Sequence, residues 1–118
     1  MALLPFAHNE ATRFISPTKT SEYLAAGRPV VSTSIRDVVQ PYGHLGLAHI
    51  ADDADLFARA MEEAMIDAAM PSWLARVDRF LSTMSWDGTW KQMNDRVREA
   101  VADRVSSSPR LPVLHGVA

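Results

Sequence analysis

The hydrophobic positions in the first fifty residues fall in three short runs. They are Ala2–Phe6, Pro29–Thr33 and Leu47–Ile50, and polar, glycine-containing or proline-containing segments separate them. Short apolar runs bounded by turn residues are typical of buried parallel strands. Pro5 lies near the end of the first run, where it is expected to end or bend the strand. The pattern therefore predicts three strands.

A helix is expected between the first two strands. Ser16 is a favourable N-cap, Pro17 suits the first helical position, and Gly27 follows Ala26 as the residue that ends the helix. Residues 8–15 before it are polar and irregular, which predicts a loop. Residues 35–46 contain one proline and two glycines, and we expect a loop there with one helical turn.

Hydrophobic residues recur every three or four positions in three later segments, which predicts amphipathic helices. Asp52 or Asp53 is expected to cap the first of these helices, Pro71 begins the second, and Ser85 caps the third. The expected apolar stripes are Leu56, Phe57, Ala60, Met61, Ala64, Met65 and Ala68; Trp73, Val77, Phe80, Leu81 and Met84; and Trp86, Trp90, Met93 and Val97, continuing through Ala100 or Val101 to Arg104 or Val105. Residues 106–118 contain two prolines without periodicity, which predicts a disordered tail.

The predicted order is strand, helix, strand, strand and three helices. Alternation of strands and helices indicates an α/β fold with a parallel sheet. A complete doubly wound domain has five or six strands, so we expect a partial Rossmann-like domain: a small parallel sheet of about three strands followed by C-terminal helices. We expect residues 1–105 to form the C-terminal half of such a domain.

Composition narrows the function classes. The chain has 118 residues, a formal net charge of -2 and no cysteine. Disulfides, cysteine-based zinc sites and thiol catalysis are excluded, and a cytoplasmic location is expected. The charge balance disfavours a nucleic-acid partner, which usually requires a clustered basic face. The sequence contains no apolar run of about 18 residues, the minimum for a membrane-spanning helix.

The start of the first predicted helix carries the candidate chemistry. Ligands of open α/β sheets bind at the carboxyl ends of the strands, where this helix begins. Free N–H groups of Thr18, Lys19 and Thr20 would attract a phosphate, and Lys19 would add a positive charge. Glu22, one turn deeper, could accept hydrogen bonds from ribose hydroxyls. Spacing alone leaves open that Lys19 and Glu22 are an ordinary exposed ion pair.

The segment "LLPFAHNEATRFISPTKTSEYLAAGRPVVST", residues 3–33, resembles the nucleotide-sugar-binding segment of family 4 glycosyltransferases. These are retaining enzymes with two facing Rossmann-like domains, the GT-B fold. Their Pro-x-Lys-x-x-Glu-Tyr-x-Ala-Ala-Gly-x-Pro-Val-Val pattern is matched by Pro17, Lys19, Glu22, Tyr23, Ala25, Ala26, Gly27, Pro29, Val30 and Val31.

The resemblance implies roles for particular residues. Glu22 matches the glutamate that binds the donor ribose, and Ser16, Pro17, Thr18 and Lys19 match the helix start that faces the diphosphate. Phe14 stands where many members have a second glutamate that faces the donor sugar. Sugar recognition is therefore expected to use the preceding loop, with the candidates His8, Asn9, Glu10, Thr12 and Arg13.

The resemblance also implies partners. The donor is a UDP- or GDP-sugar, and neither a cofactor nor a metal is expected. A glycan or lipid-linked acceptor would bind an N-terminal domain that this sequence lacks, as it lacks the upstream Arg and Lys that neutralise the diphosphate. We therefore expect an inactive fragment without a catalytic residue of its own, apart from Lys19 as a diphosphate stabiliser. The whole enzyme would work in the cytoplasm, with a peripheral position at the inner face of the membrane.

Several alternatives and secondary features stay open. A nucleotide-sugar epimerase or a glycan phosphorylase would have a similar fold, and a receiver-type binding module would suit the length. His44 and His49 lack the spacing of metal ligands. The stripe through Trp86, Trp90 and Met93 is expected to be partly exposed and to promote self-association.

Overall fold

Three short parallel strands form the centre of the first unit of the chain. In this computed structural model the chain divides into residues 1–83 and residues 84–118, and residues 1–107 are described. The strands are β1 (Ala2–Leu4), β2 (Val30–Ser32) and β3 (Ala48–Ile50), paired in the order β1-β2-β3. Both pairings are parallel. The predicted α/β class and the three-stranded parallel sheet are confirmed.

Helix α1 (Lys19–Ala25) begins later than predicted. Thr18, and not Ser16, is the residue before the helix, and its side chain makes no capping hydrogen bond. The N-cap expected at Ser16 is therefore wrong. The Pro17 carbonyl accepts the Thr20 N–H at 3.1 Å, so a turn of the chain leads into the helix in place of a side-chain cap.

The end of α1 follows the sequence prediction. Gly27 has a φ of 66°, and its N–H donates to the Leu24 carbonyl at 2.9 Å, while the Arg28 N–H donates to the Tyr23 carbonyl at 2.9 Å. This pair of bonds is a Schellman motif, which satisfies the last carbonyls of a helix and needs a left-handed residue. The motif turns the chain sharply from α1 into β2.

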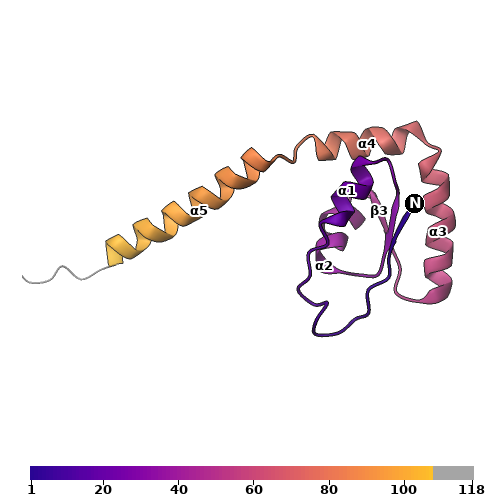
Figure 1. Cartoon of the computed structure of the whole chain (residues 1–118), viewed down its shortest axis with the longest axis horizontal. Coiled ribbons are helices and arrows are strands. Elements are labelled where there is room, and N and C mark those ends of the chain that lie inside the picture. Colours follow the sequence, from indigo (N-terminus) through magenta and orange to yellow (C-terminus); the bar gives the residue numbers. More distant parts are fainter. Residues whose placement is uncertain (108–118) are drawn as a thin grey trace, which may run out of the picture. The chain divides into compact units, whose positions relative to one another are not determined.

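The two faces of the sheet carry different helices. Val30 and Val31 are both fully buried but point to opposite faces, because side chains alternate along a strand. Val30 packs in the larger core with Leu4, Leu24 and Trp73, whereas Val31 packs in a smaller core against alanines of α3. Figure 1 shows α1 and α2 (Arg36–Val38) on one side of the strands and α3 (Ala54–Ala68) on the other.

The loop expected at 35–46 contains slightly more helix than predicted. Helix α2 continues into a second turn, η1 (Val39–Gly43), which is interrupted by an extended Gln40. The turn is held in the core by Val38 and Tyr42, both buried.

The two helices that complete the first unit start where the sequence predicts. Asp53 caps α3, since its carboxylate accepts the Leu56 N–H at 2.8 Å. Helix α4 (Pro71–Leu81) has its proline in the first turn and buries Trp73 and Val77. Residue type alone predicted a cap of α3 at Asp52 or Asp53 and the start of α4 at Pro71.

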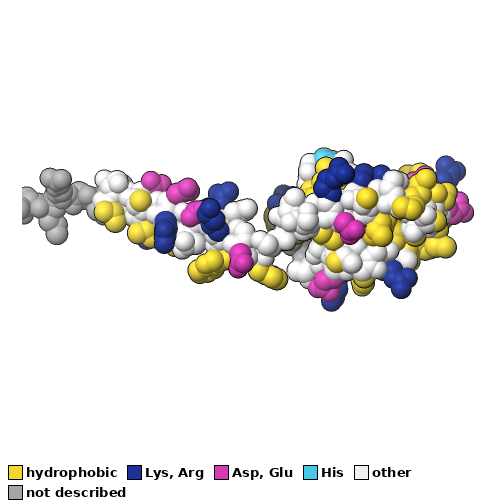
Figure 2. Space-filling view, turned by 90° about the horizontal axis from the view of Figure 1, so that it is seen from above, with side chains coloured by type: hydrophobic (Ala, Val, Ile, Leu, Met, Phe, Trp, Pro, Cys, Tyr) yellow, Lys and Arg dark blue, Asp and Glu magenta, His cyan; other side chains and the backbone are white. Residues whose placement is uncertain are grey.

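The second unit consists, in its described part, of helix α5 (Trp86–Ser107). The predicted tail began at residue 106, but Ser106 and Ser107 belong to this helix, and residues 108–118 lie outside the described residues. Trp86 is 89% exposed and Trp90 66%, and Figure 2 shows hydrophobic side chains on this helix among charged ones. Self-association through this face stays a prediction. Within residues 1–107 no helix has the length and apolar character needed to cross a bilayer.

Truncation of Leu24 tests how α1 is anchored. Leu24 is fully buried in the larger core, so Leu24→Ala should lower the free energy of unfolding by about 2–5 kcal/mol. Leu45→Ala is the matched control, because Leu45 is 51% exposed and should cost less than about 1 kcal/mol. Urea unfolding followed by circular dichroism measures both, and equal losses would contradict the core described above.

Candidate functional site

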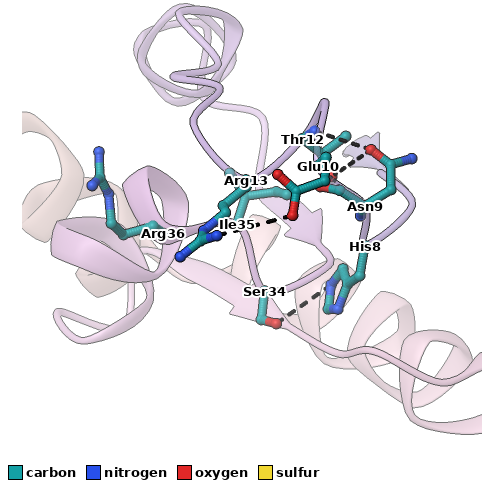
Figure 3. Close-up of a pocket in the computed structure, with 8 residues that line it drawn as sticks. All are labelled: His8, Asn9, Glu10, Thr12, Arg13, Ser34, Ile35 and Arg36. Atoms are coloured by element: carbon teal, nitrogen blue, oxygen red, sulfur yellow. Dashed lines mark hydrogen bonds and ion pairs between the residues drawn. The ribbon is translucent and has the colours of Figure 1, made fainter.

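A shallow hollow of about 500 Å³ lies at the carboxyl ends of the strands. Its walls come from the segment between β1 and α1 and from the segment between β2 and α2 (Figure 3). The lining residues are His8, Asn9, Glu10, Thr12, Arg13, Ser34, Ile35 and Arg36. The structure thus brings together all five residues that the sequence proposed as a sugar-binding loop.

The loop is held in shape by its own polar groups. The Asn9 side-chain oxygen accepts the Thr12 N–H at 3.1 Å, and the Thr12 hydroxyl accepts the Asn9 N–H at 3.1 Å. The same hydroxyl donates to the Ala7 carbonyl. These reciprocal bonds make Asn9 and Thr12 the scaffold of the loop that carries His8, Glu10 and Arg13.

His8 is linked to residues that follow the other two strands. Its Nε2 lies 3.2 Å from Oδ1 of Asp52 and 3.5 Å from the Ser34 hydroxyl. The same Asp52 oxygen accepts the Ser34 N–H at 2.7 Å. This N–H, helped by the Ser34 hydroxyl and by His8, holds the pKa of the Asp52 carboxyl below its usual range.

Two arginines line the hollow, and each faces a carboxylate. Arg13 lies 3.9 Å from Glu10 and stacks on the exposed Phe14 ring at 5.2 Å. Arg36 contacts Asp37 at 2.9 Å. Hydrogen bonds from Arg36, and then from Ser16, lower the pKa of Asp37. The positive charge around the hollow is therefore largely balanced.

The side chains of Lys19 and Glu22 contact each other on α1, and neither residue lines the hollow. Their Nζ and Oε2 atoms are 2.6 Å apart, and the two side chains are 61% and 57% exposed. The Glu22 carboxylate raises the pKa of Lys19 by hydrogen bonding and by its charge. The pair that the spacing predicted is present, and Glu22 Oε1 has no hydrogen-bond partner within residues 1–107.

The segment of residues 16–19, expected to bind the diphosphate, leads into a helix start whose N–H groups are not all free to bind phosphate. Of the three N–H groups expected to be free, that of Thr20 is bonded to the Pro17 carbonyl. The Thr18 carbonyl accepts the Ser21 hydroxyl at 3.0 Å.

Sequence reasoning missed Ser34, Arg36 and Asp52 as parts of this site. Asp52 was considered only as a helix cap, and the cap proved to be Asp53. The signal that could have found Ser34 and Asp52 is position: they are polar residues that come one and two residues after the predicted strands Pro29–Thr33 and Leu47–Ile50, at the ligand-binding edge of a sheet.

The other two histidines within residues 1–107 lie outside the hollow. His44 hydrogen-bonds Gln40. His49 lies between Asp67, 2.9 Å from Nε2, and Glu63, 3.5 Å from Nδ1. Because the two carboxylates approach different ring nitrogens, they join β3 to α3 and do not converge on one point. Within residues 1–107 no cluster of three or more histidine and acidic side chains is arranged to hold a metal ion.

No family model, curated protein or solved structure matches the chain. Function must therefore be argued from the residues of the hollow and of α1, together with the motif of residues 17–31.

The Asp52 contacts predict a pH dependence of stability. Because the folded-state pKa lies below the ordinary value of 3.8, these contacts stabilise the fold above that pH and are lost as the carboxylate is protonated in acid. Asp52→Asn should therefore be less stable than the wild type at pH 6, by less than about 1 kcal/mol for an exposed pair. The difference should shrink below pH 3.8. Urea unfolding at several pH values measures it, and a constant difference would contradict the assignment.

Proposed function

We propose that this chain forms part of the donor-binding domain of a retaining glycosyltransferase. It would bind a UDP- or GDP-sugar, whose sugar passes to a glycan or lipid-linked acceptor held by a second domain. The enzyme would work in the cytoplasm, at the inner face of the membrane. The observation that carries the proposal is the hollow at the carboxyl edge of the sheet, lined by the loop that leads into the Pro-x-Lys-x-x-Glu motif.

The position of the hollow supports a nucleotide-sugar ligand. Small molecules bind α/β sheets in crevices beyond the carboxyl ends of the strands. The hollow presents hydrogen-bonding groups of several kinds, including an imidazole, an amide, hydroxyls and guanidinium groups. Such a mixture suits the many hydroxyls of a sugar, which both donate and accept.

Helix α1 supports a nucleotide at the neighbouring position. In this proposal the free Oε1 of Glu22 accepts a ribose hydroxyl, and Lys19, already beside the same carboxylate, adds positive charge for the diphosphate. A carboxylate that accepts hydrogen bonds from neighbouring hydroxyls makes charge-assisted bonds, which are stronger than neutral ones.

The chemistry expected of this part is positioning and charge stabilisation. Departure of a nucleoside diphosphate leaves negative charge that nearby cations stabilise, and Lys19 is the candidate within this chain. We assign no nucleophile and no general base for sugar transfer to these residues. The acceptor site would belong to the second domain.

Two alternatives are less well supported. A receiver-type module needs several acids at the strand ends, whereas Asp52 is joined there by His8 and Ser34, and Asp53 caps α3. A nucleotide-sugar epimerase of similar architecture would share Glu22, so the nucleotide-binding test of Glu22 would not separate an epimerase from a transferase.

Substitution of Glu22 tests the nucleotide assignment. The chain is titrated with UDP, GDP and ADP and its NMR spectrum is monitored, and it should bind at least one of these nucleoside diphosphates weakly. Glu22→Ala should weaken that binding by about tenfold or more, since it removes hydrogen bonds to a charged group. Glu62→Ala on α3, the opposite face of the sheet from α1, is the control and should leave it unchanged. Equal affinities of wild type and Glu22→Ala would overturn the assignment.

A further inference from the structure

The proposed function counts the His8 imidazole among the groups that suit a sugar, but it gives no role to the contacts that join His8 to Ser34 and Asp52. The three residues follow β1, β2 and β3 in turn, so parallel pairing of three separate strands brings them to one place. Asp52 Oδ1 is at once 2.7 Å from the Ser34 N and 3.2 Å from His8 Nε2. The Asp52 carboxylate, which follows β3, therefore contacts both the segment after β1, through His8, and the segment after β2, through Ser34.

The arrangement does not resemble a nucleophilic triad. In such a triad the orienting carboxylate and the nucleophilic hydroxyl contact different nitrogens of the histidine, so that the ring passes a proton between them. Here Asp52 and the Ser34 hydroxyl both contact Nε2. His8 cannot accept the Ser34 proton at a nitrogen that already faces the carboxylate, so Ser34 is not activated as a nucleophile.

The same geometry determines what the other ring nitrogen can do. A carboxylate only accepts hydrogen bonds, so in the neutral imidazole the proton sits on Nε2 and Nδ1 carries a lone pair. Nδ1 has no partner among the residues that the structure describes. His8 lines the hollow, as Figure 3 shows, and it can offer a hydrogen-bond acceptor to a ligand there.

The charges around the hollow favour a neutral polyol over an anion at this point. Arg13 faces Glu10, Arg36 faces Asp37, and His8 faces Asp52. Each of the two arginines thus already has a carboxylate beside it, so the hollow offers little unbalanced positive charge to a phosphate or a carboxylate.

We propose that Asp52 is a positioning residue that holds His8 so that its Nδ1 accepts a hydrogen bond from a hydroxyl of the donor sugar. His8 then determines affinity for the sugar part of the donor, and Asp52 acts through His8. The inference rests on the proposed function, because the sugar is taken to be that of a nucleotide-sugar.

The test separates the sugar from the nucleotide. Dissociation constants are measured by NMR titration at pH 8 for UDP against UDP-glucose and for GDP against GDP-mannose. The quantity compared is the ratio of the dissociation constant of the nucleotide to that of its sugar nucleotide. In the wild type this ratio should be about five to ten for at least one of the two pairs, the equivalent of one or two hydrogen bonds. His8→Phe should bring the ratio close to one and leave the affinity for the nucleotide unchanged.

A double-mutant cycle then separates positioning from mere stability. Asp52→Asn should lower the ratio only part of the way to one. The double variant His8→Phe/Asp52→Asn should have the same ratio as His8→Phe alone. His44→Phe and Asp55→Asn, exposed residues outside the hollow, are the matched controls. A second measurement needs no variant: the ¹⁵N signal of His8 Nδ1 in the wild type should shift with the sugar nucleotide and not with the nucleotide.

The possible results separate the two proposals. Nucleotide binding with a wild-type ratio near one, or an unchanged ratio in His8→Phe, would overturn the role of His8 and leave the proposed function standing. Additive losses in the double variant would show that Asp52 does not act through His8. If the chain bound neither UDP nor GDP, both proposals would be overturned.

Discussion

The backbone pairing of β1 with β2 is the interaction on which the candidate site depends. The Ala2 N–H donates to the Pro29 carbonyl at 2.8 Å, and the Thr33 N–H donates to the Leu4 carbonyl at 3.2 Å. Just beyond the strands, the Thr33 hydroxyl donates to the Phe6 carbonyl at 2.9 Å. The chain after β1 is thus bonded to the residue that follows β2, and this bond is made at Phe6, two residues before His8. Without this pairing, His8 and Ser34 would have no common position.

Packing on both faces of the sheet keeps that pairing in place. Val30 and Val31 divide the interior between them, with α1 and α4 on one face and α3 on the other. The Schellman motif at Gly27 then directs the chain from α1 into β2. The hydrophobic core and the left-handed Gly27 therefore fix the carboxyl ends of the strands at one edge of the sheet, where the residues that follow β1 and β2 line one hollow.

Residue type and spacing were sufficient to predict the strands, the start of α4 at Pro71, a cap of α3 at Asp52 or Asp53 and the turn at Gly27, because each depends on local chemistry. The N-cap expected at Ser16 was wrong, because the chain enters α1 through a turn in which the Pro17 carbonyl accepts the Thr20 N–H. The partnership of His8, Ser34 and Asp52 could not be predicted from local chemistry. It depends on tertiary pairing of the strands, whereas the members of the His8–Arg13 loop are neighbours in sequence.

The most direct test of the central claim is a map of where a nucleotide-sugar binds. Backbone amide signals of the ¹⁵N-labelled chain are followed by NMR while UDP-glucose or GDP-mannose is added. Binding at the carboxyl edge of the sheet predicts that the largest shifts fall in residues 8–22 and 34–36, with α3 unaffected. Shifts confined to α3 or α5, or no shifts with either donor, would contradict the account.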